Sequence, residues 1–389
     1  GLVGLSDPLR PGVGELIADL HAAGIRTVMI TGDQSATAYA IASELGLSAG
    51  RPLNILDSTN LAGVDGEALK GLVQEVDGFA RVSPSHKLEI DQALQRAGRV
   101  VAMTGDGIND GPALKAADVG IAMGSAQLDV ARSVADIVIE DDNLATLVTA
   151  IAEGRTTYGN IRKALRFLLS TNFGEIGMVL ASLLLGLKPP FSAMQLLWIN
   201  LVTDIFPGLA LAQEPAEDGV LERPPRDPRT PIVSDDDLAV MIRESVVMTG
   251  GTLGAYLYGL LRHGPGSRAS TLALSSLIGG QMAHALTCRS EDASLMDLER
   301  LAPNRTLDLA LGGTIAVQTL ATLLPPLRRL LGLTPLGPLD LLVAGLASAV
   351  PALINDRIGT ASRAAADREK TAAPPADEQR PGAAAGRTS

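Results

Sequence analysis

The chain has 389 residues, of which 46% are hydrophobic and 3% aromatic, and its formal net charge is −11. The acidic balance argues against a nucleic-acid-binding protein, because such proteins need basic surfaces. The single cysteine, Cys288, excludes internal disulfides and a cysteine metal cluster. A positive mean hydropathy in so long a chain predicts membrane-spanning segments. Because the sequence begins at Gly1 rather than at a methionine, we expect a C-terminal fragment of a longer protein.

Residues 1–150 have the pattern of a soluble α/β domain. Short apolar runs predict strands at 26–30, 79–82, 100–103, 119–123 and 137–139. Helical patterns lie between them, at Gly14–Ala23, Gln34–Leu45, Ser85–Arg96 and Gly111–Ala117. For residues 53–77 we expect only short helices and turns. Strands that alternate with helices indicate a parallel sheet with crossover helices.

The most informative stretch of this domain is TGDGIND, Thr104–Asp110. Gly105 and Gly107 allow the backbone to turn sharply. Asp106 and Asp110 follow a predicted strand, at the carboxyl end where α/β sheets place their ligands. Two carboxylates on such a loop suit a hard cation such as Mg²⁺. The alternative interpretation is a solvated turn without a ligand.

Six apolar runs of roughly 20 residues, each enough to cross a bilayer, follow a helical stretch at 143–167. They lie near residues 164–187, 193–213, 238–262, 270–289, 307–325 and 337–355. The alternative, an all-helical soluble domain, is disfavoured because the runs are so many and so closely spaced. We therefore divide the chain into an α/β domain (1–150), a stalk with two spans (151–213), a cytoplasmic loop (214–237), four further spans (238–356) and a disordered tail (357–389).

Acidic and amide side chains lie inside the first two spans. Asn172 and Glu175 share one helical face, and Asn200, Thr203 and Asp204 have the spacing of another. An ionised carboxylate at the bilayer centre costs about 2.5–3.5 kcal/mol even on lenient scales. A cation held by oxygen ligands would compensate that cost.

Two alternatives remain open for these intramembrane groups. Glu175 and Asp204 could lie near the membrane interface, or be neutral and hydrogen-bonded. Gln281, inside the fourth span, could add an amide oxygen to a cation site or make a hydrogen bond between helices.

Seven motifs can be recognised along the chain. Four lie in the α/β domain: DPLRPGV (7–13), ITGDQ (30–34), FARVSPSHK (79–87) and TGDGINDGPALKAADVGIAMG (104–124). Three lie in and after the first two apolar runs: STNFGE (170–175), LLWINLVTD (196–204) and ERPPRDP (222–228). Together they resemble P-type cation-transporting ATPases of the calcium-pump-like class, the first four being similar to the phosphorylation domain and the other three to the fifth and sixth transmembrane helices and the loop that follows. The resemblance covers about residues 1–230 with specific motifs. The rest matches only in its pattern of four more spans.

The resemblance implies a fold and a location. The fold is a HAD-like α/β domain with a Rossmann-type parallel sheet, followed by an all-α transmembrane six-helix bundle. The protein would be a multi-pass protein of the cell membrane, with the soluble domain in the cytoplasm. A composition rich in arginine and alanine suggests a bacterial plasma membrane.

The resemblance also implies residues for phosphoryl transfer from ATP. Thr31 and Gly32, with Asp33 in the same loop, would hold the phosphoryl oxygens, and Lys87 would neutralise them. Such residue types suit a reaction that depends on positioning and positive charge.

The TGDGIND loop would supply the metal site. By resemblance, Asp106 binds the Mg²⁺ that accompanies phosphoryl transfer, Asn109 hydrogen-bonds the phosphate, and Asp110 completes the magnesium environment. In the membrane, the resemblance implies the transported-cation ligands Asn172, Glu175, Asn200, Thr203 and Asp204.

Two departures from the family pattern matter. No DKTGT sequence is present, so the aspartate that becomes phosphorylated is missing, together with the nucleotide-binding domain, the actuator and the first four helices. The chain alone is therefore expected to be inactive and to need the N-terminal half of the pump, in cis or as a separate chain. Gln281 stands where the calcium pump has a glutamate, which predicts one ion per cycle or an ion other than calcium.

The leading hypothesis is the C-terminal portion of an ATP-driven pump for a hard cation, with the helix at 143–167 coupling the two parts. Calcium is the first choice, followed by manganese, magnesium, sodium and potassium, because oxygen-only ligands do not suit soft metals. The main alternative is a truncated, catalytically inactive membrane protein that acts as a partner or a regulatory remnant. A soluble phosphatase of the same sheet fold would not need six spans.

Overall fold

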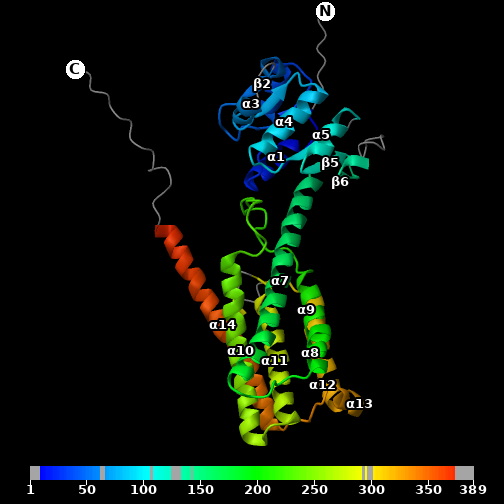
Figure 1. The fold of residues 1–389 in the computed structure, drawn as a ribbon. Helices are drawn as coiled ribbons and strands as arrows, with labels where there is room; N and C mark the ends of the chain where they lie inside the picture. Colours follow the sequence, from blue (N-terminus) through cyan, green and yellow to red (C-terminus); the bar gives the residue numbers. More distant parts are fainter. Residues whose placement is uncertain are drawn as a thin grey trace, which may run out of the picture. The chain divides into compact units, whose positions relative to one another are not determined.

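The structure, a computed structural model, describes residues 9–61, 66–105, 108–123, 133–141, 143–290, 294–295 and 301–372. The chain divides into two units, which we call the α/β unit (residues 1–155 and 218–231) and the helical unit (156–217 and 232–389). Both are drawn in Figure 1. The division falls within one uninterrupted helix, α7 (Thr146–Leu184). A long helix that leads into the first apolar run was predicted, and it is confirmed.

The described strands of the α/β unit are short and pair in parallel. One sheet has the order β1-β3-β2 and contains β1 (Met29–Ile30), β2 (Ile55–Asp57) and β3 (Gly78–Ala80). The other has the order β4-β5-β6 and contains β4 (Ala102–Gly105), β5 (Val119–Met123) and β6 (Ile137–Ile139). The parallel arrangement is confirmed, although the pairing forms two sheets. The predicted short helices in residues 53–77 are present as η1 and α3, but the strand β2 in the same stretch was not predicted.

Helices alternate with the strands along the chain and pack against them. They are α1 (Val13–Ala22), α2 (Ser35–Glu44), α3 (Gly66–Leu72), α4 (Pro84–Arg96) and α5 (Gly111–Ala116), with 3₁₀ turns η1 (Ser58–Leu61) and η2 (Ile108–Asp110). The start of α4 is set by Ser83, whose hydroxyl accepts a hydrogen bond from the His86 N–H, and by Pro84, which has no N–H to leave unpaired. Phe79 of β3 and Ile90 of α4 are fully buried in one core. This packing holds the first turn of α4 at the carboxyl end of β3.

The loop that follows the second apolar run belongs in part to the α/β unit. Residues 218–231 group with it, and Arg155 explains why. Its guanidinium donates to the carbonyl oxygens of Arg223 at 2.8 Å and Ala23 at 2.7 Å, and also to those of Val220 and Leu221. One arginine therefore ties the loop to the chain between α1 and β1.

The helical unit consists of α7 from residue 156 onward and the helices that follow it. They are α8 (Ala193–Trp198), the π-helical segment η3 (Ile199–Asp204), α9 (Ile205–Leu211), α10 (Asp235–His263), α11 (Ser267–Thr287), α12 (Arg305–Leu323), α13 (Pro325–Leu330) and α14 (Pro338–Ala372). The described residues 357–372 are helical, where a disordered tail was predicted. Alanine, arginine, glutamate and lysine in this stretch favour the helix. Residues 373–389 lie outside the described residues.

Four helical segments of the described residues are long and apolar enough to cross a membrane. They are 146–184, 193–211, 305–323 and 338–362. Of the six predicted spans, four are therefore confirmed by length and composition. Helices α10 and α11 are not among these four, and α11 is buried around its whole circumference. A helix enclosed by other helices does not need an apolar surface that faces lipid.

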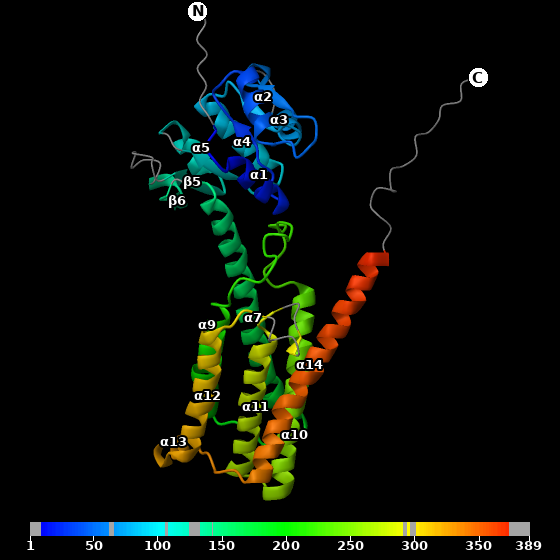
Figure 2. The same cartoon turned by 180° about the vertical axis from the view of Figure 1, so that it is seen from behind.

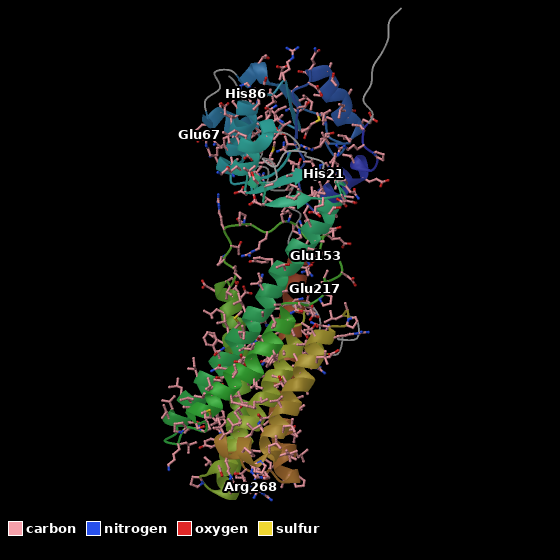
Figure 3. The ribbon with its side chains drawn as sticks, turned by 90° about the vertical axis from the view of Figure 1, so that its right-hand side faces the viewer. His21, Glu67, His86, Glu153, Glu217 and Arg268 are labelled. Carbon is pink, nitrogen blue, oxygen red and sulfur yellow. The ribbon has the colours of Figure 1, made fainter. Side chains whose placement is uncertain are left out.

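Helices α10, α11 and α14 pack closely against one another, as Figure 2 shows from behind. A Cβ atom on Gly251 of α10 would lie 2.5 Å from the Ala347 carbonyl oxygen of α14. One on Gly279 of α11 would overlap the hydroxyl of Ser348. Within the helical unit, Glu217 lies at one end and Arg268 at the other (Figure 3). Below, these are called the Glu217 end and the Arg268 end.

Candidate functional site

The first candidate site lies at the carboxyl edge of β1 and β3 in the α/β unit. The loop after β1 is held to the segment before α4, since the Thr31 carbonyl accepts from Val82 N–H at 2.9 Å and the Asp33 carbonyl from Arg81 N–H at 2.8 Å. Lys87 lies in the first turns of α4. The fold therefore brings the predicted phosphate loop and the predicted lysine to the same edge.

The loop after β1 is ordered by its own side chains. The Thr31 hydroxyl donates to the Asp33 carboxylate at 3.1 Å and accepts from the Asp33 N–H at 3.1 Å. Gly32 is exposed, and the atom nearest to an added Cβ would be the Val82 carbonyl oxygen, 3.9 Å away. The loop thus has a fixed conformation and space beside it for a ligand.

Lys87 and Asp110 form the central contact of this site. The Lys87 ammonium lies 2.6 Å from the Asp110 carboxylate, and the side chains are 19% and 10% exposed. A short, charge-assisted bond of this kind is stronger than a neutral one. Gly105 makes the arrangement possible, because a Cβ there would lie 2.7 Å from the Asp110 Cβ.

The rest of the predicted metal loop is only partly described. Asn109 is exposed beside Asp110, whereas Asp106 lies outside the described residues and its role stays a prediction. No group of three or more histidine, cysteine or acidic side chains gathers for a metal in the part of the chain that is described. Mg²⁺ commonly takes one or two carboxylates and completes its shell with phosphate and water. Asp110 fits such a donor set.

Asp57 is an acidic residue of this sheet that sequence reasoning missed. It ends β2, and hydrogen bonds from the Ser35 hydroxyl at 2.6 Å and from Thr59 lower its pKa to about 2. Arg81 lies 3.6 Å from its carboxylate. Only the recognition of β2 as a strand could have identified Asp57 at the sheet edge.

The second candidate site is a buried polar chain in the helical unit. The Gln281 amide of α11 donates to the Glu175 carboxylate of α7 at 3.0 Å. The Thr203 hydroxyl of η3 lies 2.9 Å from the Gln281 oxygen and 2.9 Å from the Ile199 carbonyl, so its single proton can serve either. All three linked side chains are buried. Three separate helical segments therefore meet through one polar chain.

Asp204, next to Thr203, has no such partner. It is 3% exposed, and both carboxylate oxygens are buried without a hydrogen bond to any residue that the structure describes. Glu175 is the other buried acid of this region, and it is hydrogen-bonded to Gln281. A buried carboxylate without a donor is costly, and a cation bound by Asp204 would supply the missing partner.

The two predicted asparagine ligands are not part of this buried chain. The Asn172 amide donates to the Leu168 carbonyl of its own helix at 2.6 Å. Asn200 is exposed, whereas Thr203 and Asp204 are buried, and all three lie in the π-helical segment η3. The role of Asn200 as a cation ligand stays a prediction.

A further buried acid was not predicted. Glu244 of α10 is 1% exposed, and Arg166 of α7 binds both of its carboxylate oxygens, with the Ser170 hydroxyl 3.3 Å from one of them. The sequence feature that could have identified Glu244 is its position as a charged residue within the third apolar run, 238–262. This acid already has its countercharge, which distinguishes it from Asp204.

Family models match both parts of the chain. Residues 188–358 match the model described as cation transporting ATPase, C-terminus. Residues 1–118 match the model of haloacid dehalogenase-like hydrolases. The hydrolase model thus covers the α/β part of the chain, which contains the first candidate site, and the cation transporting ATPase model covers most of the helical part, which contains the second.

Curated relatives match nearly the whole chain. The calcium-transporting ATPase of Bacillus subtilis is 39% identical over 360 residues, which cover 91% of this chain and 40% of the relative. The calcium-transporting ATPase type 2C member 1 of Homo sapiens is 38% identical over 90% of this chain and 38% of the relative. Calcium-transporting ATPase 1 of Schizosaccharomyces pombe is 36% identical over 88% and 39%. The chain spans about two fifths of the length of these relatives.

Proposed function

Because the chain is homologous to the C-terminal portion of P-type cation-transporting ATPases, we propose that it is part of an ATP-driven pump that moves a hard cation across a membrane. The observation that carries the proposal is Asp204, a buried carboxylate without a hydrogen-bond donor beside the polar chain of Glu175, Gln281 and Thr203. Calcium is the preferred ion, because the relatives are named calcium-transporting ATPases and the available ligands are oxygens.

In the α/β unit, the proposed role is phosphoryl transfer from ATP. Lys87 would neutralise the phosphoryl oxygens, and the loop at Thr31 and Gly32 would orient them. Mg²⁺, held by Asp106 and Asp110, would supply further positive charge to the same oxygens. Asp110 would also keep the ammonium of Lys87 in place through their 2.6 Å contact. The phosphorylated aspartate must come from a DKTGT motif, which this sequence does not contain.

In the helical unit, we propose six membrane spans, with α10 and α11 added to the four apolar segments. The neutral Gln281 favours one divalent ion per cycle, since Glu175 and Asp204 together balance a charge of two. The α/β unit would lie in the cytoplasm, and the N-terminal half of the pump would be the partner, in cis or as a separate chain. Helix α7 would couple ion binding to phosphoryl transfer.

The test is phosphorylation of the full-length protein by ATP in a panel of Ca²⁺, Mn²⁺, Mg²⁺, Na⁺ and K⁺. We expect one hard cation to stimulate phosphorylation, Asp106→Ala to abolish it, and Glu175→Gln to raise the cation concentration it requires. Asp308→Asn, on the exposed face of α12, is the matched control and should match the wild type. Full cation stimulation in Glu175→Gln would contradict the ion site. No phosphorylation under any cation would favour an inactive membrane remnant.

A further inference from the structure

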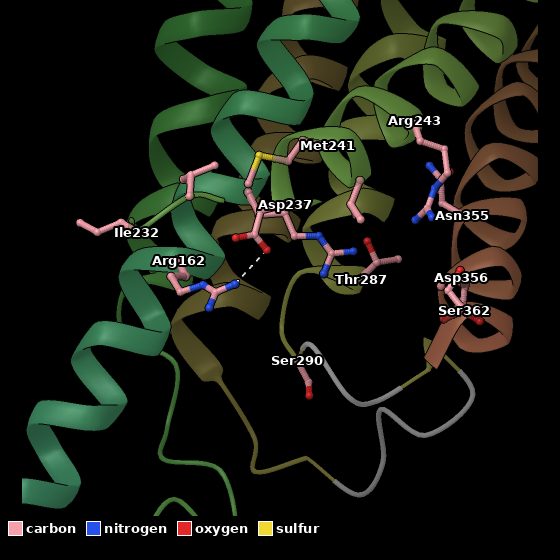
Figure 4. A pocket seen from close by; sticks show the side chains of 14 residues that line it. Arg162, Ile232, Asp237, Met241, Arg243, Thr287, Ser290, Asn355, Asp356 and Ser362 are labelled. Carbon is pink, nitrogen blue, oxygen red and sulfur yellow. Dashed lines mark hydrogen bonds and ion pairs between the residues drawn. The ribbon is translucent and has the colours of Figure 1, made fainter. Parts of the chain in front are cut away.

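A cationic cavity lies at the Glu217 end of the helical unit, outside the polar chain described above. Its volume is about 230 Å³, and α7, α10, α14 and the end of α11 contribute to its walls (Figure 4). Three arginines line it, Arg162, Arg166 and Arg243, together with the acids Asp237 and Asp356. Its lining therefore has a positive balance.

Most of these charges already have a partner. Arg162 lies 2.9 Å from Asp237, the pair marked in Figure 4. Arg166 binds the buried Glu244. Asp356 accepts hydrogen bonds from the Ser294 hydroxyl and the Leu295 N–H.

Arg243 is different. Its closest carboxylate is that of Glu244, at 4.0 Å, and Arg166 already occupies that group. The Nε–H of Arg243 is buried and has no acceptor among the described residues. Asn355, which also lines the cavity and is 4% exposed, has a buried side-chain oxygen without a donor. The cavity thus offers an anion donor and, beside it, a neutral acceptor.

A second, apolar groove lies between α10 and α14, the helices that also contribute to the cavity. Its volume is about 510 Å³, and only aliphatic residues, glycines and one proline line it. On α10, Arg243 in the cavity is followed by Val247, Gly250 and Gly254 in the groove. On α14, Asn355 in the cavity directly follows Ile354 in the groove. The two hollows therefore follow one another along the same pair of helices, polar at the Glu217 end and apolar beyond it, and together we call them the α10–α14 seam.

The length and the free space of the seam fit an acyl chain. From Arg243 to Gly254, α10 rises about 16 Å at 1.5 Å per residue. This is about half of the 30 Å hydrocarbon core, the depth of one lipid leaflet. A Cβ atom added at Gly250 or Gly254 would meet nothing within 4 Å, so the groove is open where an acyl chain would lie.

We propose that the α10–α14 seam binds one anionic phospholipid. The phosphate accepts hydrogen bonds from Arg243, a headgroup hydroxyl donates to Asn355, and one acyl chain fills the groove at Gly250 and Gly254. A soluble anion would use the cavity alone, and a partner helix would use the groove alone. Only an amphiphile matches both halves of the seam. The proposal goes beyond ion transport and does not depend on which cation is carried.

The test is native mass spectrometry of the full-length protein in detergent, with phosphatidylglycerol or phosphatidylcholine of identical acyl chains. We expect one retained phosphatidylglycerol, and about tenfold weaker retention in Arg243→Gln, because a hydrogen bond to a charged group is lost. Gly254→Leu fills the groove without a backbone clash and should weaken retention similarly. Arg329→Gln on α13 and Gly313→Leu on α12 are exposed matched controls and should retain the lipid.

Three results would overturn the proposal. One is equal retention of phosphatidylglycerol by wild type, Arg243→Gln and Gly254→Leu. Another is equal retention of phosphatidylglycerol and phosphatidylcholine by the wild type. The third is displacement of the lipid by inorganic phosphate with no effect of Gly254→Leu, which would identify a soluble anion as the ligand. If Arg243→Gln does not fold, Gly254→Leu still decides between lipid and free anion.

Discussion

The substitution Asp204→Asn tests the buried carboxylate directly. Asparagine has nearly the same shape but no charge, and the wild-type group is 3% exposed with neither oxygen hydrogen-bonded to a described residue. A buried neutral polar group without a partner costs about 1–3 kcal/mol, and a charged one costs more. Asparagine leaves its amide unpaired as well but removes the charge, so without cation we expect Asp204→Asn to be more stable than wild type by roughly 1 kcal/mol, with a melting temperature several degrees higher.

Calcium should reverse this order. An ion that binds only the folded state adds about 2.7 kcal/mol at a concentration of 100 times its dissociation constant. The wild type should gain this stabilisation and Asp204→Asn should not. The assay is thermal unfolding in detergent, first with chelator and then in a calcium titration, with Asp308→Asn as the control. An equal calcium-induced shift in Asp204→Asn, or a lower melting temperature in chelator, would refute the reasoning.

Three further predictions concern the α/β unit. Gly105→Ala should displace Asp110, the partner of Lys87, and lower the free energy of unfolding by about 1–3 kcal/mol. Gly111→Ala should change it little, because a Cβ there meets nothing within 4 Å. Equal effects of the two substitutions in calorimetry would contradict the steric argument. Burial raises the pKa of Asp91 to about 6, so the folded state binds the proton more tightly than the unfolded state. As pH rises from about 4 to about 6, wild type should therefore lose roughly 1 kcal/mol of stability relative to Asp91→Asn. A difference in melting temperature between the two that does not change with pH would argue against this. Arg155→Ala should speed amide hydrogen exchange in residues 218–231 about tenfold. Arg155→Lys should not restore protection, because an ammonium cannot donate in the planar geometry of a guanidinium. Unchanged exchange in Arg155→Ala would show that other contacts hold the loop.

The order of elements in the α/β unit could be predicted because each element has a local signal. The strand at Val119–Met123 agrees with its predicted bounds, since a buried run of five apolar-biased residues is long enough to recognise. The strand at Ile55–Asp57 was missed because two apolar residues followed by an aspartate give no period. Strand β1 is shorter than predicted and keeps only Met29 and Ile30.

Residue types at the candidate sites could be predicted, but not their geometry. The resemblance identified Lys87 and Asp110, yet their contact depends on a bare backbone at Gly105 that a motif does not reveal. In the second apolar run, α-helical spacing grouped Asn200 with Thr203 and Asp204. The structure has a π-helical segment there, with Asn200 exposed and the other two residues buried, and spacing alone does not reveal this difference.

The close packing of α10, α11 and α14 has a mechanical consequence. The α14 backbone approaches Gly251 of α10, and the Ser348 side chain of α14 approaches Gly279 of α11, so a shift of these helices past one another would break close contacts. Gln281 belongs to this rigid block, whereas Glu175 and Asp204 belong to helices outside it. If Glu175, Asp204 and Gln281 bind the cation as proposed, Gln281 would stay in place during transport, and ion release would come from motion of α7 and η3. Spin-label distances between α10 and α14 should then stay constant on calcium addition, while those from α9 to α10 change.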